Sequence, residues 1–255
     1  FQRVRGLPVT GELDEATAKA LDVTPETVLG RYTIEAADLE EIGPVPQSWV
    51  ARSKLKRLGH EALEDVICEK FHCTRALLAS LNRGKQINQL KRGDQVVVPR
   101  LDPREDWPNA AFLEVNFAEK TIRAIGTDKK LTALFHCSIA ASKSKLPSRD
   151  ATVVVTAPNP IYTFDPKMWP EVKEKVSSKL EIPPGPRNPV GRFWIGLSLD
   201  GYGMHGTPNP ELIGKTGSHG CFRLANWDAI RLGRMVRVGT PVKFVNRSSG
   251  DEKGS

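Results

Sequence analysis

The chain has 255 residues, of which 39% are hydrophobic and 26% are charged, and it carries a formal net charge of +7. This length holds one large domain or two to three small ones, and no apolar run approaches the ~20 residues of a membrane-spanning helix. The basic balance favours an anionic partner, either nucleic acid or a carboxylate-rich polymer. Because the basic residues are scattered and not interleaved with aromatic residues, nucleic acid is the less favoured of the two.

The first 25 residues predict a turn followed by a short helix. Gly6 and Gly11 punctuate the turn, and Asp14 is placed to cap a helix that ends near Leu21. The stretch Gly-Leu-Pro-Val-Thr-Gly-Glu-Leu-Asp resembles the last part of a small peptidoglycan-binding domain, so residues 1–25 are interpreted as its C-terminal remnant. Since Phe1 follows neither Met nor an apolar leader, we expect a cleaved signal segment or a start inside a longer protein.

Residues 31–100 predict a second unit in the order strand, helix, helix, strand. The strands are expected at residues 32–34 and 95–99, and the helices at residues 61–71 and 75–81, the second capped by Thr74. This order, with Leu-Asn after the second helix and Gly-Asp before the last strand, resembles a LysM domain. The resemblance implies binding of glycans that contain N-acetylglucosamine, although an insertion between Ile34 and Ala62 departs from the compact pattern.

Four cysteines stand at positions 68, 73, 137 and 221, and they lack the paired Cys-x-x-Cys and histidine spacing of a zinc site. No metal or other cofactor is therefore expected. Cys68 and Cys73 are five residues apart at the end of a predicted helix. Two interpretations stay open for them: a disulfide across the helix end, or two small apolar packing residues.

Residues 101–109 are rich in proline and acidic residues and are expected to be a linker. After it the pattern changes to alternating strands at residues 112–116, 121–125, 131–140 and 152–156. A long proline-rich crossing follows between residues 158 and 189, with a short helix expected at residues 171–180. A segment this long without regular structure is usually functional, and we expect it to form a lid over a cleft.

The C-terminal part returns to regular structure. Strands are predicted at residues 191–197, 201–206 and 240–245, and a helix at residues 226–232, while residues 247–255 are predicted to be a disordered tail. The predicted fold class is α+β and multi-domain, with a mainly-β domain over residues 110–246 preceded by the small βααβ unit.

The segment from Met204 to Arg223 carries the chemistry. Cys221 ends a turn of small and polar residues, and His205 lies sixteen residues upstream. A thiol needs a neighbouring base or cation to react at neutral pH, and histidine usually supplies it. The backbone N–H groups of His219, Gly220 and Cys221 are expected to converge as an oxyanion hole on this glycine-flanked turn.

The pattern His-Gly, spacer, Ser-His-Gly-Cys-x-Arg resembles the signature of the L,D-transpeptidase catalytic domain, the YkuD family. The matching positions are His205, Gly206, Ser218, His219, Gly220, Cys221 and Arg223. The resemblance covers roughly residues 110–246. It implies acyl transfer through a thioester on tetrapeptide stems of peptidoglycan, giving 3→3 cross-links, and an exported or periplasmic protein of the cell envelope. The partners implied are the peptide stems and the glycan strands, without nucleic acid or an integral membrane segment.

Each motif residue receives an expected role from this resemblance. Cys221 is the nucleophile, His205 the base and the backbone carbonyl of Gly206 the group that orients the imidazole, while His219 belongs to the oxyanion loop. Protonated His205 is expected to stabilise the Cys221 thiolate. The residues expected to contact substrate are Tyr202, Met204, Ser218 and Arg223.

Other functions remain as alternatives to cross-linking. The same nucleophile serves L,D-carboxypeptidation, with water as acceptor, and ligation of a protein to peptidoglycan. An inactive peptidoglycan-binding envelope protein is disfavoured because His205, Gly220 and Cys221 are all intact. An unrelated cysteine peptidase is disfavoured because no Asn or Asp partner motif accompanies the pair.

Overall fold

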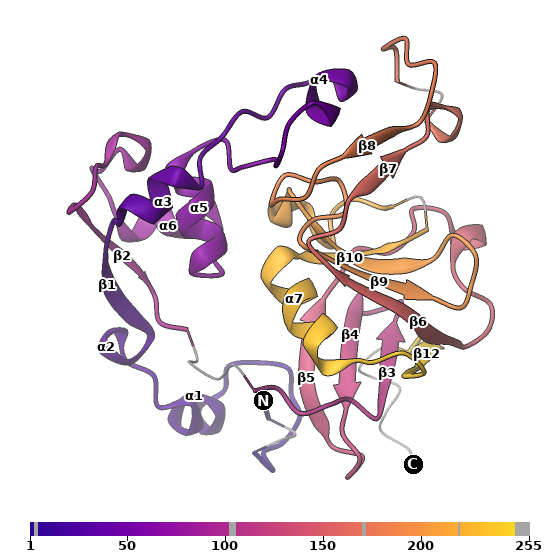
Figure 1. Ribbon diagram of the computed structural model, residues 1–255. Coiled ribbons are helices and arrows are strands. Elements are labelled where there is room, and N and C mark those ends of the chain that lie inside the picture. The colour runs from indigo at the N-terminus through magenta and orange to yellow at the C-terminus, as the bar shows by residue number, and fades with distance from the viewer. Residues whose placement is uncertain (3–4, 102–105, 170–171, 219, 248–255) are drawn as a thin grey trace.

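The computed structural model describes residues 1–2, 5–101, 106–169, 172–218 and 220–247, and all structural statements concern these (Figure 1). They form a small N-terminal segment, an N-terminal unit of residues 29–101 and a sheet unit of residues 106–247. Among them no helix has both the length and the apolar character needed to cross a bilayer. Most of the predicted tail lies outside the described residues, as does the middle of the predicted linker.

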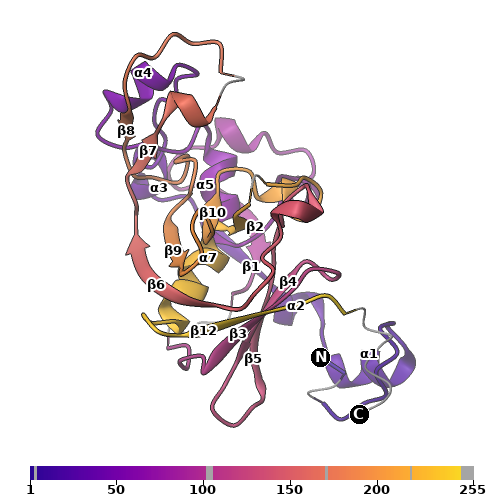
Figure 2. The same ribbon diagram turned by 90° about the vertical axis from the view of Figure 1, so that its right-hand side faces the viewer.

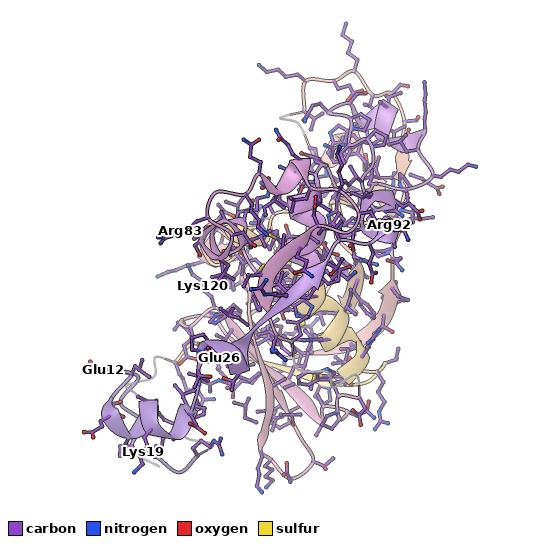
Figure 3. All side chains as sticks on the ribbon, turned by 90° about the vertical axis from the view of Figure 1, so that its left-hand side faces the viewer. Glu12, Lys19, Glu26, Arg83, Arg92 and Lys120 are labelled. Atoms are coloured by element: carbon purple, nitrogen blue, oxygen red, sulfur yellow. The ribbon has the colours of Figure 1, made fainter. Side chains whose placement is uncertain are left out.

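The first helix begins where its cap predicts. In α1 (Glu15–Leu21) the Asp14 carboxylate accepts the Thr17 N–H at 2.8 Å. The buried Gln2 amide holds the segment together by donating to the hydroxyls of Thr10 and Thr17, both at 2.8 Å. Figure 2 shows α1 at the edge of the molecule, and Figure 3 shows the same segment with Glu12 before the helix and Lys19 within it. A short α2 (Pro25–Val28) leads on into the N-terminal unit.

The N-terminal unit contains the two predicted strands and the two predicted helices, with additional short helices between the first strand and α5. Strand β1 (Leu29–Thr33) pairs antiparallel with β2 (Gln95–Pro99), and α5 (Leu63–Lys70), α6 (Arg75–Leu81) and the 3₁₀ turn η1 (Ile87–Gln89) lie between them in sequence. The Asn82 amide ties the end of α6 to β2 by donating to the Val97 carbonyl and accepting the Val97 N–H, each at 2.8 Å. The insertion adds two unpredicted short helices, α3 (Ala36–Glu40) and α4 (Trp49–Ser53).

The sheet unit is built on eight strands in the order β11-β10-β9-β6-β12-β3-β4-β5 (Figure 1). Their bounds are β3 Phe112–Asn116, β4 Thr121–Ile125, β5 Leu131–His136, β6 Ala151–Pro158, β9 Phe193–Leu197, β10 Gly203–Thr207, β11 Phe222–Ala225 and β12 Pro241–Val245. Two neighbouring pairs, β10 with β11 and β12 with β3, are parallel, and the other pairs are antiparallel. The long helix α7 (Asn226–Met235) packs its apolar face against β9 and β10.

Beyond His136 the chain differs from the predicted strand. The strand ends at His136, and two 3₁₀ turns lie in loops of the sheet unit: η2 (Lys143–Lys145) and η4 (Pro210–Leu212). Residues 138–141 run beside the segment that leads to Cys221. Ser138 exchanges two backbone hydrogen bonds with Arg223, at 2.9 and 3.0 Å, and the Ser218 N–H reaches the Ile139 carbonyl at 2.9 Å. The segment therefore braces the turn that carries Cys221.

The proline-rich crossing forms a hairpin of β7 (Tyr162–Phe164) and β8 (Leu180–Ile182), with η3 (Pro166–Met168) between them. The helix predicted over residues 171–180 is wrong, since residues 172–179 are not helical. The Glu174 carboxylate instead caps the N-terminus of α4. It accepts hydrogen bonds from the Ser48 hydroxyl at 2.6 Å and from the Trp49 N–H at 2.7 Å. Trp49 stacks on Phe164 with ring centroids 4.1 Å apart, so α4 and the hairpin share a small apolar cluster.

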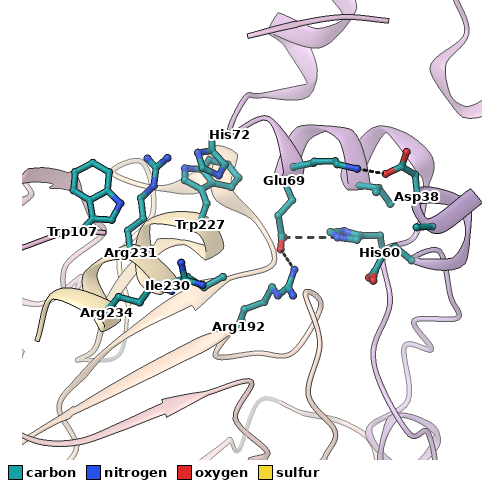
Figure 4. Close-up of a pocket in the computed structure, with 14 residues that line it drawn as sticks. Asp38, His60, Glu69, His72, Trp107, Arg192, Trp227, Ile230, Arg231 and Arg234 are labelled. Atoms are coloured by element: carbon teal, nitrogen blue, oxygen red, sulfur yellow. Dashed lines mark hydrogen bonds and ion pairs between the residues drawn. The ribbon is translucent and has the colours of Figure 1, made fainter. Parts of the chain in front are cut away.

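The two units meet at Glu69, on α5. Its carboxylate accepts from the Arg192 guanidinium at 3.1 Å and from the Asn226 amide at 2.9 Å, and it lies 4.0 Å from the His60 imidazole. Figure 4 shows Glu69 between His60 and Arg192, with His72 lying against Trp227 of α7 nearby. A cavity of about 500 Å³ opens between the units at this point.

We expect Glu69→Ala to lower the free energy of unfolding by about 1–3 kcal/mol. The substitution removes the charged acceptor of the Arg192 guanidinium and of the buried Asn226 amide. Urea denaturation followed by circular dichroism measures this change. The matched control is Glu40→Ala, which removes an exposed carboxylate of α3 and should change stability by about 0.5 kcal/mol or less. Equal losses in the two variants would contradict a central role of Glu69 at the interface.

Candidate active site

The register of two parallel strands brings the candidate residues together. His205 on β10 is the partner of Arg223 on β11. Paired residues on adjacent strands point to the same face of a sheet, and side chains alternate along each strand. Cys221 immediately precedes β11, and its sulfur accepts a hydrogen bond from the N–H of Gly203, two residues before His205 on β10.

The same alternation corrects one prediction. Met204 was expected to contact substrate, but it is fully buried in the main core of the sheet unit, opposite Phe222. As the residue before His205, it necessarily points to the other face of β10. Met204 therefore packs in the core, on the face of β10 opposite His205, and does not line the candidate site.

His205 has one ring nitrogen fixed by its own backbone. Its Nδ1 lies 2.6 Å from the carbonyl oxygen of Gly206. A carbonyl only accepts hydrogen bonds, so Nδ1 carries the proton and Nε2 keeps a free lone pair. Trp194 of β9 stacks on the imidazole with centroids 5.7 Å apart and planes 23° apart. The ring is thereby held in place and is only 6% exposed.

Burial lowers the pKa of His205 to about 4, the hydrogen bond to Gly206 opposes this, and the Arg223 charge lowers the pKa further. At neutral pH the imidazole is uncharged. A pKa of about 4 argues against the expected stabilisation of a resting Cys221 thiolate by protonated His205. An uncharged imidazole with a free Nε2 lone pair is the form that accepts a proton.

Cys221 is half-buried, with its sulfur 3.7 Å from the carbonyl oxygen of Gly201. Burial raises the pKa of the Cys221 thiol, while a hydrogen bond from the Gly203 N–H and the charge of Arg223 lower it. The net shift is upward, so the thiol is protonated at neutral pH. The Gly203 N–H and the Arg223 guanidinium are thus placed to stabilise a negative charge on the Cys221 sulfur, although the resting thiol carries no charge.

The turn before Cys221 is held by a serine. The Ser218 hydroxyl donates to the carbonyl oxygen of Cys221 and accepts the Gly220 N–H at 3.2 Å. The sequence predicts that the Gly220 N–H is free for an oxyanion, but in this structure it is bound to the Ser218 hydroxyl. Ser218 closes the turn, so it serves the geometry of the loop more directly than a substrate contact. His219 lies outside the described residues.

The two other predicted substrate contacts flank this turn. Arg223 donates through Nη2 to the carbonyls of Thr216 and Gly217, which braces the approaching loop. Its Nε is buried, and no hydrogen-bond partner for it occurs among the described residues. Tyr202 donates its hydroxyl to the Lys145 carbonyl at 3.1 Å, with its ring beside Gly220.

Three contacts of the site were not predicted. The Asn226 amide, 2% exposed, lies so close to Gly206 that an added Cβ there would come within 2.3 Å of its oxygen. The Trp194 indole covers Gly203, where a Cβ would lie 2.4 Å from the ring. Tyr162 of the β7–β8 hairpin is close enough to Cys221 for a negative sulfur to raise its pKa, which burial already raises.

Comparison with known proteins agrees with this architecture. The model of the L,D-transpeptidase catalytic domain (YkuD) matches residues 110–244, and the chain belongs to this family. A putative L,D-transpeptidase YkuD of Bacillus licheniformis is 27% identical over 184 residues, covering 72% of this chain and 93% of that protein. A putative L,D-transpeptidase YqjB of Bacillus subtilis is 31% identical over 149 residues, covering 55% of this chain and 76% of that protein.

A solved L,D-transpeptidase of Enterococcus faecium superimposes with a TM-score of 0.39 and 17% identity. That superposition covers 54% of this chain and 50% of the other, so this chain spans about half of the solved protein.

The protonation states make a prediction for thiol reactivity. Alkylation of Cys221 by iodoacetamide should rise with a midpoint above the ~8.5 of an ordinary thiol, without a plateau at low pH. In His205→Ala the midpoint should not rise, because no positive charge is removed. In Arg223→Gln it should move upward, since a cation that favours the thiolate is lost. A resting ion pair would give the opposite result for His205→Ala, with a clear upward shift.

Proposed function

We propose that this protein is a cysteine-dependent L,D-transpeptidase acting on tetrapeptide stems of peptidoglycan. The observation that supports the proposal is the parallel pairing of β10, which carries His205, with β11, which Cys221 immediately precedes; the Nδ1 of His205 is bound to the Gly206 carbonyl. Family membership supports the class of reaction. The basic surface balance suits a polymer rich in carboxylates.

The first half-reaction is acylation. As the Cys221 sulfur attacks the carbonyl between the third stem residue, a diamino acid, and the terminal D-alanine, its proton passes to Nε2 of His205. The C–N bond breaks, and the same proton goes to the departing amine, so D-alanine leaves and a thioester remains on Cys221. Because both partners start uncharged, charge separation develops only along the reaction path.

The second half-reaction regenerates the enzyme. The side-chain amine of a neighbouring stem loses a proton to His205 and attacks the thioester, which forms the 3→3 amide and returns the thiol. Water in place of the amine gives carboxypeptidation, and an amine on a protein gives ligation to the wall. The same residues serve all three outcomes, and the acceptor decides which product forms.

Backbone N–H groups stabilise the tetrahedral intermediates in this proposal. The Cys221 N–H and the turn residues His219 and Gly220 are the assigned donors. For Gly220 this requires its N–H to leave the Ser218 hydroxyl when substrate binds. Tyr202 and Arg223 flank the turn and are the proposed substrate contacts, with Arg223 available to a stem carboxylate.

The remaining parts of the chain fit a protein that works on an extended polymer. We assign residues 31–100 to a LysM-like domain that contacts glycan strands, residues 1–25 to a peptidoglycan-binding remnant and residues 110–246 to the catalytic domain. The β7–β8 hairpin, close to Cys221, acts as a lid over the stem. An exported or periplasmic location follows from this substrate.

The direct test uses purified disaccharide-tetrapeptides as the only substrate, with products resolved by mass. A dimer that has lost one D-alanine is expected, and Cys221→Ala should form none while keeping a native circular dichroism spectrum. A tripeptide without dimers would identify water as the acceptor and make the enzyme a carboxypeptidase. Product formation by the Ala variant at the rate of the unmodified protein would refute the proposal.

General-base catalysis by His205 makes a kinetic prediction. His205→Ala should slow acylation by about two to four orders of magnitude, the usual contribution of such a base. His219→Ala keeps the backbone N–H of its position and should slow acylation less. Single-turnover release of D-alanine measures both rates. If His219→Ala were inactive and His205→Ala nearly normal, with both folded, the base would be misassigned.

A carbapenem should inactivate the protein covalently, because its strained amide carbonyl occupies the position of the acyl donor and forms a thioester. The intact mass should rise by one drug equivalent, located on a peptide that contains Cys221. Adduct formation on Cys68, Cys73 or Cys137 instead would count against Cys221 as the nucleophile. Cys221→Ser serves as the matched control, since it lacks only the sulfur.

A further inference from the structure

Helix α5 ends in a hydrogen-bonded turn that places two cysteines against one another. The helix closes at Lys70, and His72 takes a left-handed conformation with φ of 50°. The Cys73 N–H then reaches back to the Cys68 carbonyl at 3.0 Å, and the His72 N–H reaches the Glu69 carbonyl at 3.4 Å. These two bonds define a Schellman motif, in which the side chains at the positions of Cys68 and Cys73 commonly contact each other.

The contact between the two side chains is present in this protein. Both are buried, at 6% and 4% exposure, within the same apolar cluster of the N-terminal unit, and both are free thiols. The Cys68 thiol donates a hydrogen bond to the Cys73 sulfur, which lowers the pKa of Cys73. In most Schellman motifs this contact is between two apolar side chains, whereas here it is between two groups that can be oxidised.

The pair is also reachable from outside the protein. Cys68 and Cys73 both line a cavity of about 560 Å³ between the two units, together with Arg187 and Trp227 of the sheet unit. The other two cysteines are separated from them. Cys137 is fully buried in the core of the sheet unit, and Cys221 lies on the turn before β11.

We propose that Cys68 and Cys73 are an oxidation site, which a low-molecular-weight or protein disulfide converts into a disulfide bond across the end of α5. The Cys73 thiolate attacks one sulfur of the oxidant and releases a thiol. The Cys68 sulfur, on losing its proton to solvent, then attacks Cys73 Sγ of the mixed disulfide and releases the second thiol. Two protein thiols are oxidised and one external disulfide is reduced, and no step uses Cys221 or the proposed acyl transfer.

The bond would fix the contact between the two units. His72, inside the loop that the bond closes, stacks on Trp227 of α7 with centroids 5.3 Å apart and planes 11° apart. Helix α7 directly follows β11 and begins with Asn226, the residue that binds Glu69 of α5. Oxidation therefore stabilises the turn that presents His72 to the sheet unit.

The sequence between the two cysteines permits a direct readout. Trypsin cleaves after Lys70, so Cys68 falls in the peptide of residues 58–70 and Cys73 in the peptide of residues 71–75. The full chain with Cys221→Ala, which removes the half-buried competing thiol, is treated with glutathione disulfide, alkylated and digested without reductant. The two peptides should run as one linked species, which dithiothreitol separates. Cys73→Ser in the same background should give none.

Several results would overturn the proposal. They are a stable glutathione adduct on Cys73, both thiols recovered fully alkylated, or linkage of either thiol to Cys137. The linked peptides are measured in the Cys221→Ala protein, which keeps both Cys68 and Cys73. Poor folding of the Cys73→Ser variant would therefore not affect that measurement. Thermal denaturation gives a second readout. The oxidised protein should have a Tm a few degrees above that of the reduced protein, and Cys73→Ser should show no such difference.

A matched pair of variants tests the geometry behind the proposal. His72→Gly accepts the left-handed conformation and loses only the ring, so the disulfide should form as readily as in the parent. His72→Val places a β-branched residue where φ is positive, which disfavours the turn, and pairing should slow several-fold. Equal pairing rates in the two variants would show that this turn does not bring the thiols together.

Discussion

The buried amide of Asn226 is the constraint on which the arrangement of this protein depends. Its oxygen accepts the Arg192 N–H at 3.1 Å and lies so close to Gly206 that any side chain there would collide with it. Its nitrogen donates to Glu69 of the N-terminal unit. One side chain thus joins the strand that carries His205, the start of α7 and the neighbouring unit. A buried amide of this kind is stabilising only while all its partners are present, because an unpaired polar group is costly away from water.

Burial sets the chemistry of the candidate site as well as its geometry. Trp194 and the sheet exclude water from His205, so the imidazole stays uncharged, and the neighbouring thiol stays protonated. A site of this type keeps a weakly reactive resting thiol and a base that is ready to accept its proton. The N–H of Gly203 and the charge of Arg223 are already placed where negative charge would appear on sulfur, and preorganised groups of this kind need little rearrangement during reaction.

Local chemistry in the sequence predicted much of this fold. Asp14 caps α1 and Thr74 caps α6 where the cap rules expect them, and the alternating pattern places β3 and β4 at the predicted residues. The motif also predicted the family, because it is short and its spacing is specific, and the family model matches residues 110–244. The helix expected near Glu174 failed for a tertiary reason, since that carboxylate caps α4, more than a hundred residues away in the chain.

Other features depend on three-dimensional packing that no local pattern encodes. Met204 is next to the histidine in sequence, yet strand alternation sends it into the core. The pKa of His205 depends on what covers it, and Trp194, eleven residues upstream, does so only because β9 pairs with β10. The role of Glu69 was likewise invisible, because its partners Arg192 and Asn226 belong to a different unit of the chain.

The central claim is that the Cys221 sulfur becomes covalently acylated during turnover, and rapid acid quenching tests it most directly. The protein is mixed with a disaccharide-tetrapeptide whose side-chain amine is blocked, so that no acceptor amine is present, and intact masses are read over milliseconds to minutes. The account predicts a transient species heavier by the stem minus D-alanine, labile to hydroxylamine and mapped to Cys221. Release of D-alanine with the protein unmodified at every time, or acylation at another residue, would contradict it.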